Sequence, residues 1–257
     1  MAQISTKPAD PAARRLAGLL ADAGRIVPFT GAGISTESGI PDFRSPGSPW
    51  LTNKPIDFAL FVASEAARRE AWRRKFAIDD LHRGARPGPG HAALARLVHE
   101  GRSPGIITQN IDGLHQASGV PEDRLVELHG NGTYAVCLGC GLRHELEAVR
   151  ADFESSGRAP RCTSCGEPVK SGTISFGQAM PGRAMAQAGE WTRQADLFLA
   201  VGSSLQVLPA AGFPRLAKQG GARLVIVNRE ATALDDIADV VIRGEIGAVL
   251  GPLCATH

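Results

Sequence analysis

The chain has 257 residues, of which 43% are hydrophobic and 21% are charged. Its formal net charge of +2 gives no strong field of the kind that attracts nucleic acid, so no direct nucleic-acid partner is expected. No apolar run reaches the roughly 18 residues that a membrane span needs. We therefore expect a cytoplasmic, globular protein without a membrane partner, built as one large domain or as one domain with a small module.

The first predicted element is a helix from Ala12 to Ala23, where apolar residues recur at helical spacing and Gly24 provides a stop. A short buried strand from Arg25 to Phe29 then leads into the glycine-rich turn Thr30-Gly-Ala-Gly33. A strand followed by such a turn is typical of the start of a dinucleotide-binding unit.

Five further strands are predicted along the chain, at 105–108, 125–128, 196–201, 223–227 and 239–242. Most are continuous apolar runs, as expected for strands that are buried on both faces of a parallel sheet. Helical stretches lie between several of them, for example at 91–100 and 209–219. The alternation predicts an α/β fold with a Rossmann-like, doubly wound parallel sheet.

Two stretches interrupt this alternation. Residues 47–86 are rich in Arg, Ala and aromatic side chains and are expected to form a helical insertion, whereas residues 133–170 carry four cysteines in a small inserted module. The segments 10–46, 87–132 and 171–257 would form the sheet domain, so that the two inserted stretches and the sheet together make up one unit of residues 1–257. Modules inserted beside an open parallel sheet create a cleft at the strand ends, where such folds bind ligands.

The cysteines of the small module have the spacing of a metal site. They form two C-x-x-C pairs, Cys137 with Cys140 and Cys162 with Cys165. Four thiolates complete the tetrahedral set that Zn²⁺ prefers and leave no open position, so we expect one structural zinc ion. The alternative is a set of buried or disulfide-bonded cysteines, but disulfides are disfavoured because the N-terminus does not look like a signal peptide.

The turn Gly31-Ala32-Gly33, with Ser35 after it, would bring backbone N–H groups close to a pyrophosphate, because glycine has no Cβ to block the approach. A tight turn without a ligand would show the same G-x-G pattern. The next glycine is Gly39, which departs from G-x-G-x-x-G, and no acidic residue ends a second strand about 20 residues further on. Asn228 and Glu230, after the strand at 223–227, are instead candidates to hold the adenosine ribose.

Three more motifs carry candidate chemistry. In Gly39-Ile-Pro-Asp-Phe-Arg44, Arg44 could pair with phosphate oxygens and Phe43 could cover a reacting sugar, although a plain surface turn has the same composition. Asn110 and Asp112 follow a strand and could recognise a carboxamide, or they could cap the next helix. His129 ends the strand at 125–128 and is the nearest acid–base candidate, although a lone histidine is more often structural.

Together these motifs resemble the sirtuin family of NAD-dependent protein lysine deacylases, in its bacterial type. The resemblance runs from about Ala12 to the C-terminus. It rests on six motifs that occur in sirtuin order and spacing: Gly31-Ala-Gly33-Ile-Ser35, Gly39-Ile-Pro-Asp-Phe-Arg44, Thr108-Gln-Asn-Ile-Asp112, His129-Gly130, the four cysteines and Gly202-Ser-Ser204.

The resemblance implies a role for each matching residue. His129 would act as general base on a ribose hydroxyl, with Asn110 as a second catalytic residue. An acylated-lysine peptide would lie between Phe176-Gly177 and Val207-Leu208 and gain backbone hydrogen bonds by strand addition. The acyl group would pass to ADP-ribose, releasing nicotinamide. The residues implied to bind NAD are Gly31, Ala32, Gly33, Ser35, Asp42, Phe43, Arg44, Gln109, Asn110, Ile111, Asp112, Gly202, Ser203, Ser204, Asn228, Arg229, Glu230 and Ile246.

Departures from the family pattern fall on the substrate side. Gln178 stands where sirtuins often carry an acidic residue, and Lys170-Ser-Gly-Thr173 replaces a Lys-Pro-Asp type of segment. Members that prefer acidic acyl groups use a Tyr-x-x-Arg pair, and the best-aligned residues here are Trp72 and Lys75. A lysine lacks the fork geometry of arginine. Neutral acyl groups are therefore expected to be favoured over acidic ones.

Two other functions compete with deacylation. A mono-ADP-ribosyltransferase would use the same NAD pocket with another nucleophile, and His129 argues against it as the main activity. A non-enzymatic zinc-ribbon module that binds nucleic acid would need a basic, aromatic-studded face, and this chain has a near-neutral charge and a single tyrosine.

Overall fold

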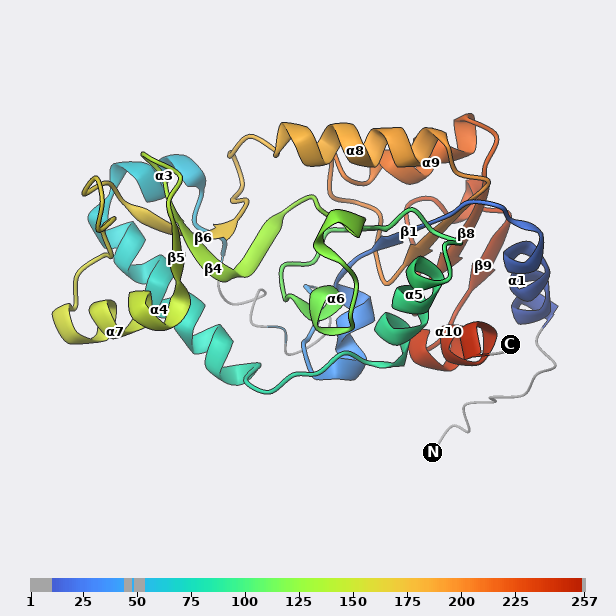
Figure 1. The fold of residues 1–257 in the computed structure, drawn as a ribbon, viewed down its shortest axis with the longest axis horizontal. Helices are drawn as coiled ribbons and strands as arrows, with labels where there is room; N and C mark the ends of the chain where they lie inside the picture. Colours follow the sequence, from blue (N-terminus) through green and yellow to red (C-terminus); the bar gives the residue numbers. More distant parts are fainter. Residues whose placement is uncertain (1–10, 44–47, 49–53, 256–257) are drawn as a thin grey trace.

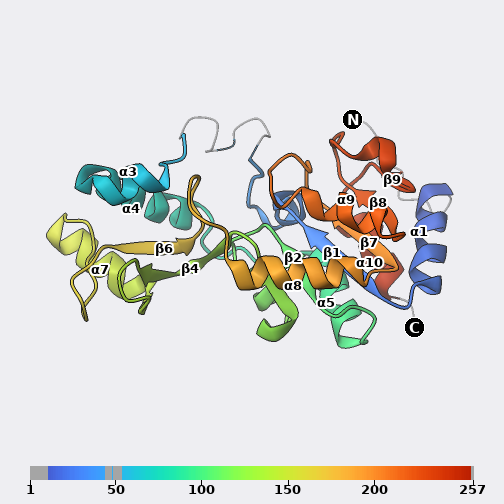
Figure 2. The same ribbon diagram turned by 90° about the horizontal axis from the view of Figure 1, so that it is seen from above.

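A computed structural model of the chain describes residues 11–43, 48 and 54–255. The described part is elongated, with a parallel sheet and its covering helices at one end and a smaller sheet with its own helices at the other (Figures 1 and 2). None of the described helices is long and apolar enough to cross a lipid bilayer.

All six strands predicted for the main sheet are present, and each bound lies within one residue of the prediction. The strands pair in parallel in the order β3-β2-β1-β7-β8-β9. They are β1 (Ile26–Thr30), β2 (Ile106–Thr108), β3 (Leu125–Glu127), β7 (Leu197–Val201), β8 (Arg223–Val227) and β9 (Val240–Ile242). The order reverses between β1 and β7, which is where open α/β sheets bind ligands.

Helices cover both faces of this sheet, as predicted for a doubly wound fold. Strand side chains alternate between the faces: Ile26 packs in the cluster that includes Leu16 and Leu94, and Val27 in the cluster that includes Trp191 and Phe213. The first face is covered by α1 (Pro11–Asp22), α5 (Pro89–His99) and α10 (Ile246–Ala255), the second by α8 (Gly182–Arg193) and α9 (Gly212–Gln219). The short α6 (Leu114–Ala117) follows β2.

The small sheet is antiparallel and consists of β5-β4-β6. Its strands β4 (Gly130–Cys137) and β6 (Val169–Thr173) extend three residues beyond the predicted bounds of the cysteine module, and β5 (Arg143–Glu145) leads into α7 (Leu146–Ser156). The predicted helical insertion contains α3 (Phe58–Ala63) and α4 (Glu65–Leu81). The division of the chain at 133–170 and 47–86 stays a prediction.

The helical insertion and the cysteine module share one core. Trp72 and Phe76 of α4 pack in one apolar cluster with Val149 of α7 and with Cys137 and Cys162. The Trp72 indole Nε1 donates a hydrogen bond of 3.1 Å to the Val169 carbonyl oxygen. These contacts fix the position of α4 against the small sheet.

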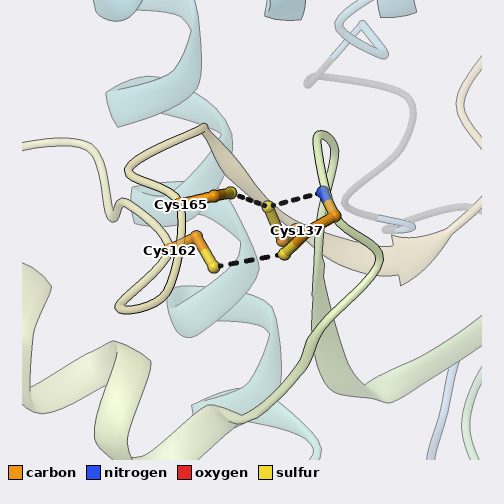
Figure 3. A group of neighbouring side chains, drawn as sticks. Cys137, Cys162 and Cys165 are labelled. Atoms are coloured by element: carbon orange, nitrogen blue, oxygen red, sulfur yellow. Dashed lines mark hydrogen bonds between the residues drawn. The ribbon is translucent and has the colours of Figure 1, made fainter.

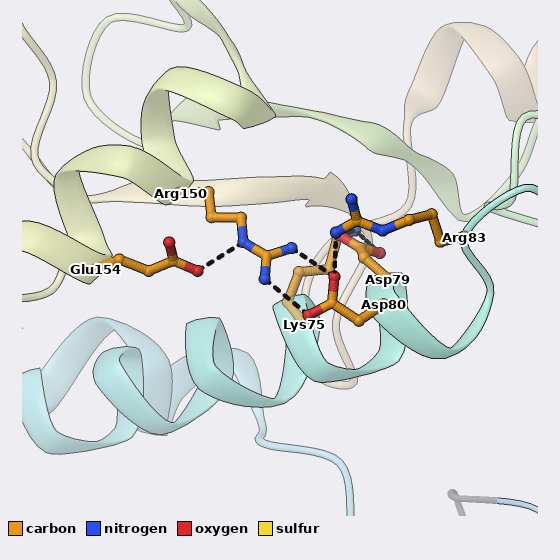
Figure 4. A network of polar contacts seen from close by, with 6 residues as sticks. All are labelled: Lys75, Asp79, Asp80, Arg83, Arg150 and Glu154. Atoms are coloured by element: carbon orange, nitrogen blue, oxygen red, sulfur yellow. Dashed lines mark hydrogen bonds and ion pairs between the residues drawn. The ribbon is translucent and has the colours of Figure 1, made fainter.

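An ion pair at the surface adds to this connection. Arg150 of α7 donates two hydrogen bonds of 2.7 Å to the carboxylate of Asp80 on α4 (Figure 4). Such a bidentate pair fixes orientation, but exposed pairs contribute little to stability. The apolar core is therefore the main link between α4 and the cysteine module.

We expect Trp72→Ala to lower the free energy of unfolding by about 3–5 kcal/mol, since the large side chain is 2% exposed and its removal leaves a cavity. Urea denaturation followed by circular dichroism measures this. The exposed residue Arg69 on the same helix provides the control, and Arg69→Ala should stay within about 0.5 kcal/mol of the wild type. A similar effect of both substitutions would contradict the shared core.

Candidate functional site

The carboxyl ends of the main strands border a cavity of about 970 Å³, which is also lined by residues of α4 and the small sheet. Every residue predicted to bind NAD, to catalyse or to hold the peptide lines this cavity, except Arg44, which lies outside the described residues. Sequence motifs spread from Gly31 to Ile246 are thus brought together at the edge of one sheet.

The loops after β1 and β7 touch each other at the point where the strand order reverses. Gly31 N donates to the Val201 carbonyl oxygen at 3.0 Å, and Gly33 N donates to that of Gly202 at 2.8 Å. A Cβ on Gly31 or Gly33 would lie 2.8 or 2.7 Å from atoms of Gly202, and Gly202 itself has a left-handed φ of 64°. The two glycines therefore allow close contact between the loops, and their N–H groups are bonded to protein carbonyls. The contact of this turn with a pyrophosphate stays a prediction.

Polar side chains from the loops after β1, β2 and β7 form two sets of hydrogen bonds, a network of Ser35, Asn110 and Asp112 and a pair of Gln109 and Ser203. Ser35 Oγ donates to Asp112 Oδ2 at 2.7 Å and accepts from Asn110 Nδ2 at 3.2 Å. Gln109 Nε2 donates to Ser203 Oγ at 2.8 Å. Asn110 is 8% exposed. The network orients these side chains at the cavity wall before any ligand is present.

The two carboxylate oxygens of Asp112 have different partners, and its recognition of a carboxamide stays a prediction. Its Oδ1 accepts a hydrogen bond of 2.9 Å from Leu114 N, the first residue of α6, as a capping residue would. Its Oδ2 bonds Ser35 at the cavity. The side chain of Asn110 bonds Ser35, and this hydrogen bond is part of the network at the cavity.

Sequence reasoning missed a buried layer behind this network. His115 Nε2 lies 2.8 Å from Thr30 Oγ1, Thr30 Oγ1 donates to Thr108 Oγ1 at 2.8 Å, and Thr108 Oγ1 accepts from Asn110 N at 3.0 Å. Burial lowers the pKa of His115 to about 3, so this histidine is neutral. The only signal in the sequence was that polar residues end two otherwise apolar strands.

His129 sits between β3 and β4 with its ring at the cavity. Its Nδ1 lies 2.9 Å from the Gln109 carbonyl oxygen. A carbonyl only accepts, so Nδ1 carries the proton and the lone pair is on Nε2. Burial lowers the pKa of His129, and the bond to the Gln109 carbonyl opposes this effect. The neutral ring that results can accept a proton.

The remaining predicted NAD residues lie on the β8 and β9 side. Asn228 Nδ2 donates to the Glu230 carbonyl oxygen at 2.8 Å, and Arg229 lies 3.7 Å from Asp42 and 3.5 Å from Glu245. Phe43 has 48% of its surface exposed at the cavity. An exposed aromatic ring at a cavity is placed to cover a bound ligand.

The predicted peptide residues form an exposed apolar rim. Phe176 is 59% exposed and Leu208 is 76% exposed, and both line the same cavity as His129. The Phe176 carbonyl oxygen accepts a hydrogen bond of 2.9 Å from Phe58 N. Exposed apolar side chains next to a cavity are typical of a binding groove.

The four cysteines come together as predicted. Their sulfur atoms lie within 4.8 Å of one another, and all four thiols are free. Figure 3 shows the sulfurs of Cys137, Cys162 and Cys165 turned toward one another. Backbone N–H groups of Gly139 and Cys140 donate to Cys137 Sγ at 3.3 and 3.4 Å, which suits a thiolate. The cluster fits a closed, tetrahedral structural zinc ion and excludes the disulfide alternative.

Comparison with known proteins agrees with this geometry. The model of the Sir2 family matches residues 31–209. The NAD-dependent protein deacetylase of Rhodopseudomonas palustris is 61% identical over 238 residues, covering 93% of this chain and 94% of the relative. The chain belongs to the Sir2 family. NAD-dependent protein deacetylase 1 of Bradyrhizobium diazoefficiens is 60% identical over 238 residues, with 93% of each chain covered.

A solved structure supports the same assignment. A Sir2 protein in complex with a p53 peptide and NAD⁺ matches with a TM-score of 0.80 and 36% identity, covering 91% of this chain and 93% of that chain. The sirtuin fold predicted from the motifs is thus confirmed. The cavity of about 970 Å³ also suits a dinucleotide, since it opens at the switch point of the sheet, where Gly31, Gly33 and Gly202 carry no side chain.

We expect Cys165→Ser to lose bound zinc, because three thiolates bind zinc less tightly than four and the open position admits water. Metal analysis of the purified protein should find about one zinc per chain in the wild type and less in the variant. Cys254→Ser is the matched control, since Cys254 lies outside both C-x-x-C pairs. Full zinc content in Cys165→Ser would contradict the assignment.

Proposed function

We propose that this sirtuin is an NAD-dependent protein lysine deacylase that acts on acetyl or related neutral acyl groups. One observation carries the proposal: a neutral His129, the Asn110–Ser35–Asp112 network and the contact between the β1 and β7 loops all border one cavity. The names of the relatives from Rhodopseudomonas palustris and Bradyrhizobium diazoefficiens support it.

The proposed roles follow from the contacts of each residue. Bound NAD would supply a ribose that accepts the acyl group and a nicotinamide that leaves. His129, held by the Gln109 carbonyl through Nδ1, would take a proton from a ribose hydroxyl at Nε2. Asn110 and Asp112 would hold the carboxamide side of the ligand, and Phe43 and Arg44 would cover the sugar and pair with phosphate.

The protein substrate would enter along the exposed rim. An extended peptide between Phe176-Gly177 and Val207-Leu208 would place its acyl-lysine side chain in the cavity that holds His129. A p53 peptide and a propionylated peptide occur in solved complexes of related Sir2 proteins, which supports a peptide substrate here. A cytoplasmic location is part of the proposal, because four free thiols persist as zinc ligands in a reducing compartment.

The test is a mass-spectrometric assay with NAD and peptides that carry acetyl-, propionyl-, butyryl-, longer fatty acyl- or succinyl-lysine, run with the wild type and with His129→Ala. We expect NAD-dependent loss of neutral acyl groups together with the matching O-acyl-ADP-ribose. His129→Ala should lower the rate by about 10²–10⁴-fold, the usual contribution of a general base. Circular dichroism should show an unchanged fold.

Three outcomes would contradict the proposal in different places. Full activity of His129→Ala would exclude His129 as the base. Nicotinamide release without acyl transfer would indicate a hydrolase or an ADP-ribosyltransferase that uses the same cavity. NAD left untouched over the whole panel would contradict the assignment of the site.

The pH dependence should report the burial of His129. The unprotonated ring is the active form, so kcat/KM should be constant at neutral pH and fall as the pH drops through the pKa. Since burial lowers that pKa, the fall should begin below the ordinary histidine value of about 6.5. A pH profile of kcat/KM with a saturating NAD concentration measures it. A midpoint above the ordinary value would contradict this environment.

A further inference from the structure

One face of α4 forms a wall of the reaction cavity. Residues three and four apart on a helix share a face, and the α4 residues that line the cavity follow this spacing. The α4 part of the wall contains apolar and charged side chains in equal number, and Leu146 at the start of α7 adds a further apolar side chain. The α4 residues in the wall are Ala71, Trp72, Arg74, Lys75, Ile78 and Asp79.

Two charged residues of this wall form an ion pair. Lys75 Nζ donates to both carboxylate oxygens of Asp79, one turn further along α4 (Figure 4). The Lys75 side chain is 18% exposed and that of Asp79 is 34% exposed. The pair is thus partly withdrawn from water, where charge interactions are stronger than at a free surface.

Two further cationic side chains that line the cavity, Arg74 of α4 and Lys170 of β6, are also engaged. Arg74 Nε donates to Glu70 at 2.6 Å. Lys170 is 4% exposed, and its Nζ donates to the Thr173 carbonyl oxygen at 2.5 Å. Asp79 therefore places a negative charge in the wall. It also occupies the ammonium group of Lys75, which would otherwise be available to a substrate carboxylate.

This arrangement treats neutral and acidic acyl groups differently. A neutral acyl chain places no charge against the wall and can contact the apolar side chains. A chain that ends in a carboxylate would meet the charge of Asp79 and would have to compete with it for Lys75. Like charges that are close together in a partly dry site repel strongly, and a buried carboxylate without a partner is costly.

We propose that Asp79 is a specificity-determining residue, which excludes acyl groups ending in a carboxylate by neutralising Lys75 in the wall of the cavity. The inference rests on the proposed deacylase function and deepens it. It gives a structural cause for the neutral preference expected from the sequence, where only Trp72 and Lys75 were considered.

The test compares kcat/KM for succinyl- and glutaryl-lysine peptides with kcat/KM for the acetyl-lysine peptide. We expect Asp79→Asn to raise the acidic-to-neutral ratio by about tenfold or more, because the repelling charge is gone and Lys75 is free to pair with the substrate. Adding Lys75→Met to Asp79→Asn should abolish the gain. A gain that survives in the double variant would overturn the proposal.

Asp80→Asn is the matched control. Asp80 is the next residue of α4, it is also ion-paired, with Arg83 and with Arg150 of α7 (Figure 4), and it does not line the cavity. The substitution changes the net charge equally but does not alter the cavity wall, so the ratio should stay at the wild-type value. An equal rise in Asp80→Asn would show a general charge effect and overturn the proposal.

If Asp79→Asn folds poorly, a second variant and a binding measurement test the same proposal. Asp79→Ser should raise the ratio as well, and calorimetric titration of succinyl-lysine peptide should show tighter binding to either variant than to the wild type. Wild-type deacetylation with an unchanged ratio in both variants would overturn this inference alone. A wild type that releases no acyl group from any peptide would overturn the proposed function, while the titration would still test Asp79.

Discussion

The cavity is built around the contact between the loops that follow β1 and β7. These two strands are neighbours at the point where the sheet reverses its order, and the hydrogen bond from Gly33 N to the Gly202 carbonyl oxygen closes the loops on each other at 2.8 Å. Side chains at Gly31 or Gly33 would prevent this approach. Because the loops lie so close, Ser35 and Ser203 are brought to the side chains of Asn110 and Gln109, and the polar network follows.

Burial determines the protonation of the two histidines near this network. His129 and His115 both have a lowered pKa because they are withdrawn from water, so both rings stay neutral. For His115 this preserves a hydrogen-bonded layer through Thr30 and Thr108 behind the site. For His129, the carbonyl of Gln109 holds the proton on Nδ1 and leaves Nε2 as a base. Burial therefore keeps His115 neutral in the hydrogen-bonded layer and keeps His129 neutral for the proposed proton transfer.

The cysteine module is connected to the cavity through α4. Cys137 and Cys162 pack in the same apolar cluster as Trp72, and Trp72 also lines the cavity. A closed four-thiolate site performs no chemistry of its own, but it stabilises the small sheet on which α4 rests. The wall that contains Lys75 and Asp79 is consequently positioned by the apolar core that α4 shares with the cysteine module. This connection explains why the small module belongs to the site although its four cysteines do not line the cavity.

The sequence by itself determined the six strands of the main sheet, the four-cysteine cluster and a set of motif residues that line the cavity, because apolar runs, ligand spacing and motifs are local properties of the chain. Tertiary structure alone decided what partners those residues have. The two glycines lie against Gly202, the two predicted insertions share one core, and Thr30 and His115 support Asn110 from behind through Thr108. The Lys75–Asp79 pair has ordinary helical spacing, and its proposed role in acyl specificity depends on its place in the cavity wall. Contacts between residues that are distant in sequence depend on how whole elements pack, and no local pattern encodes that packing.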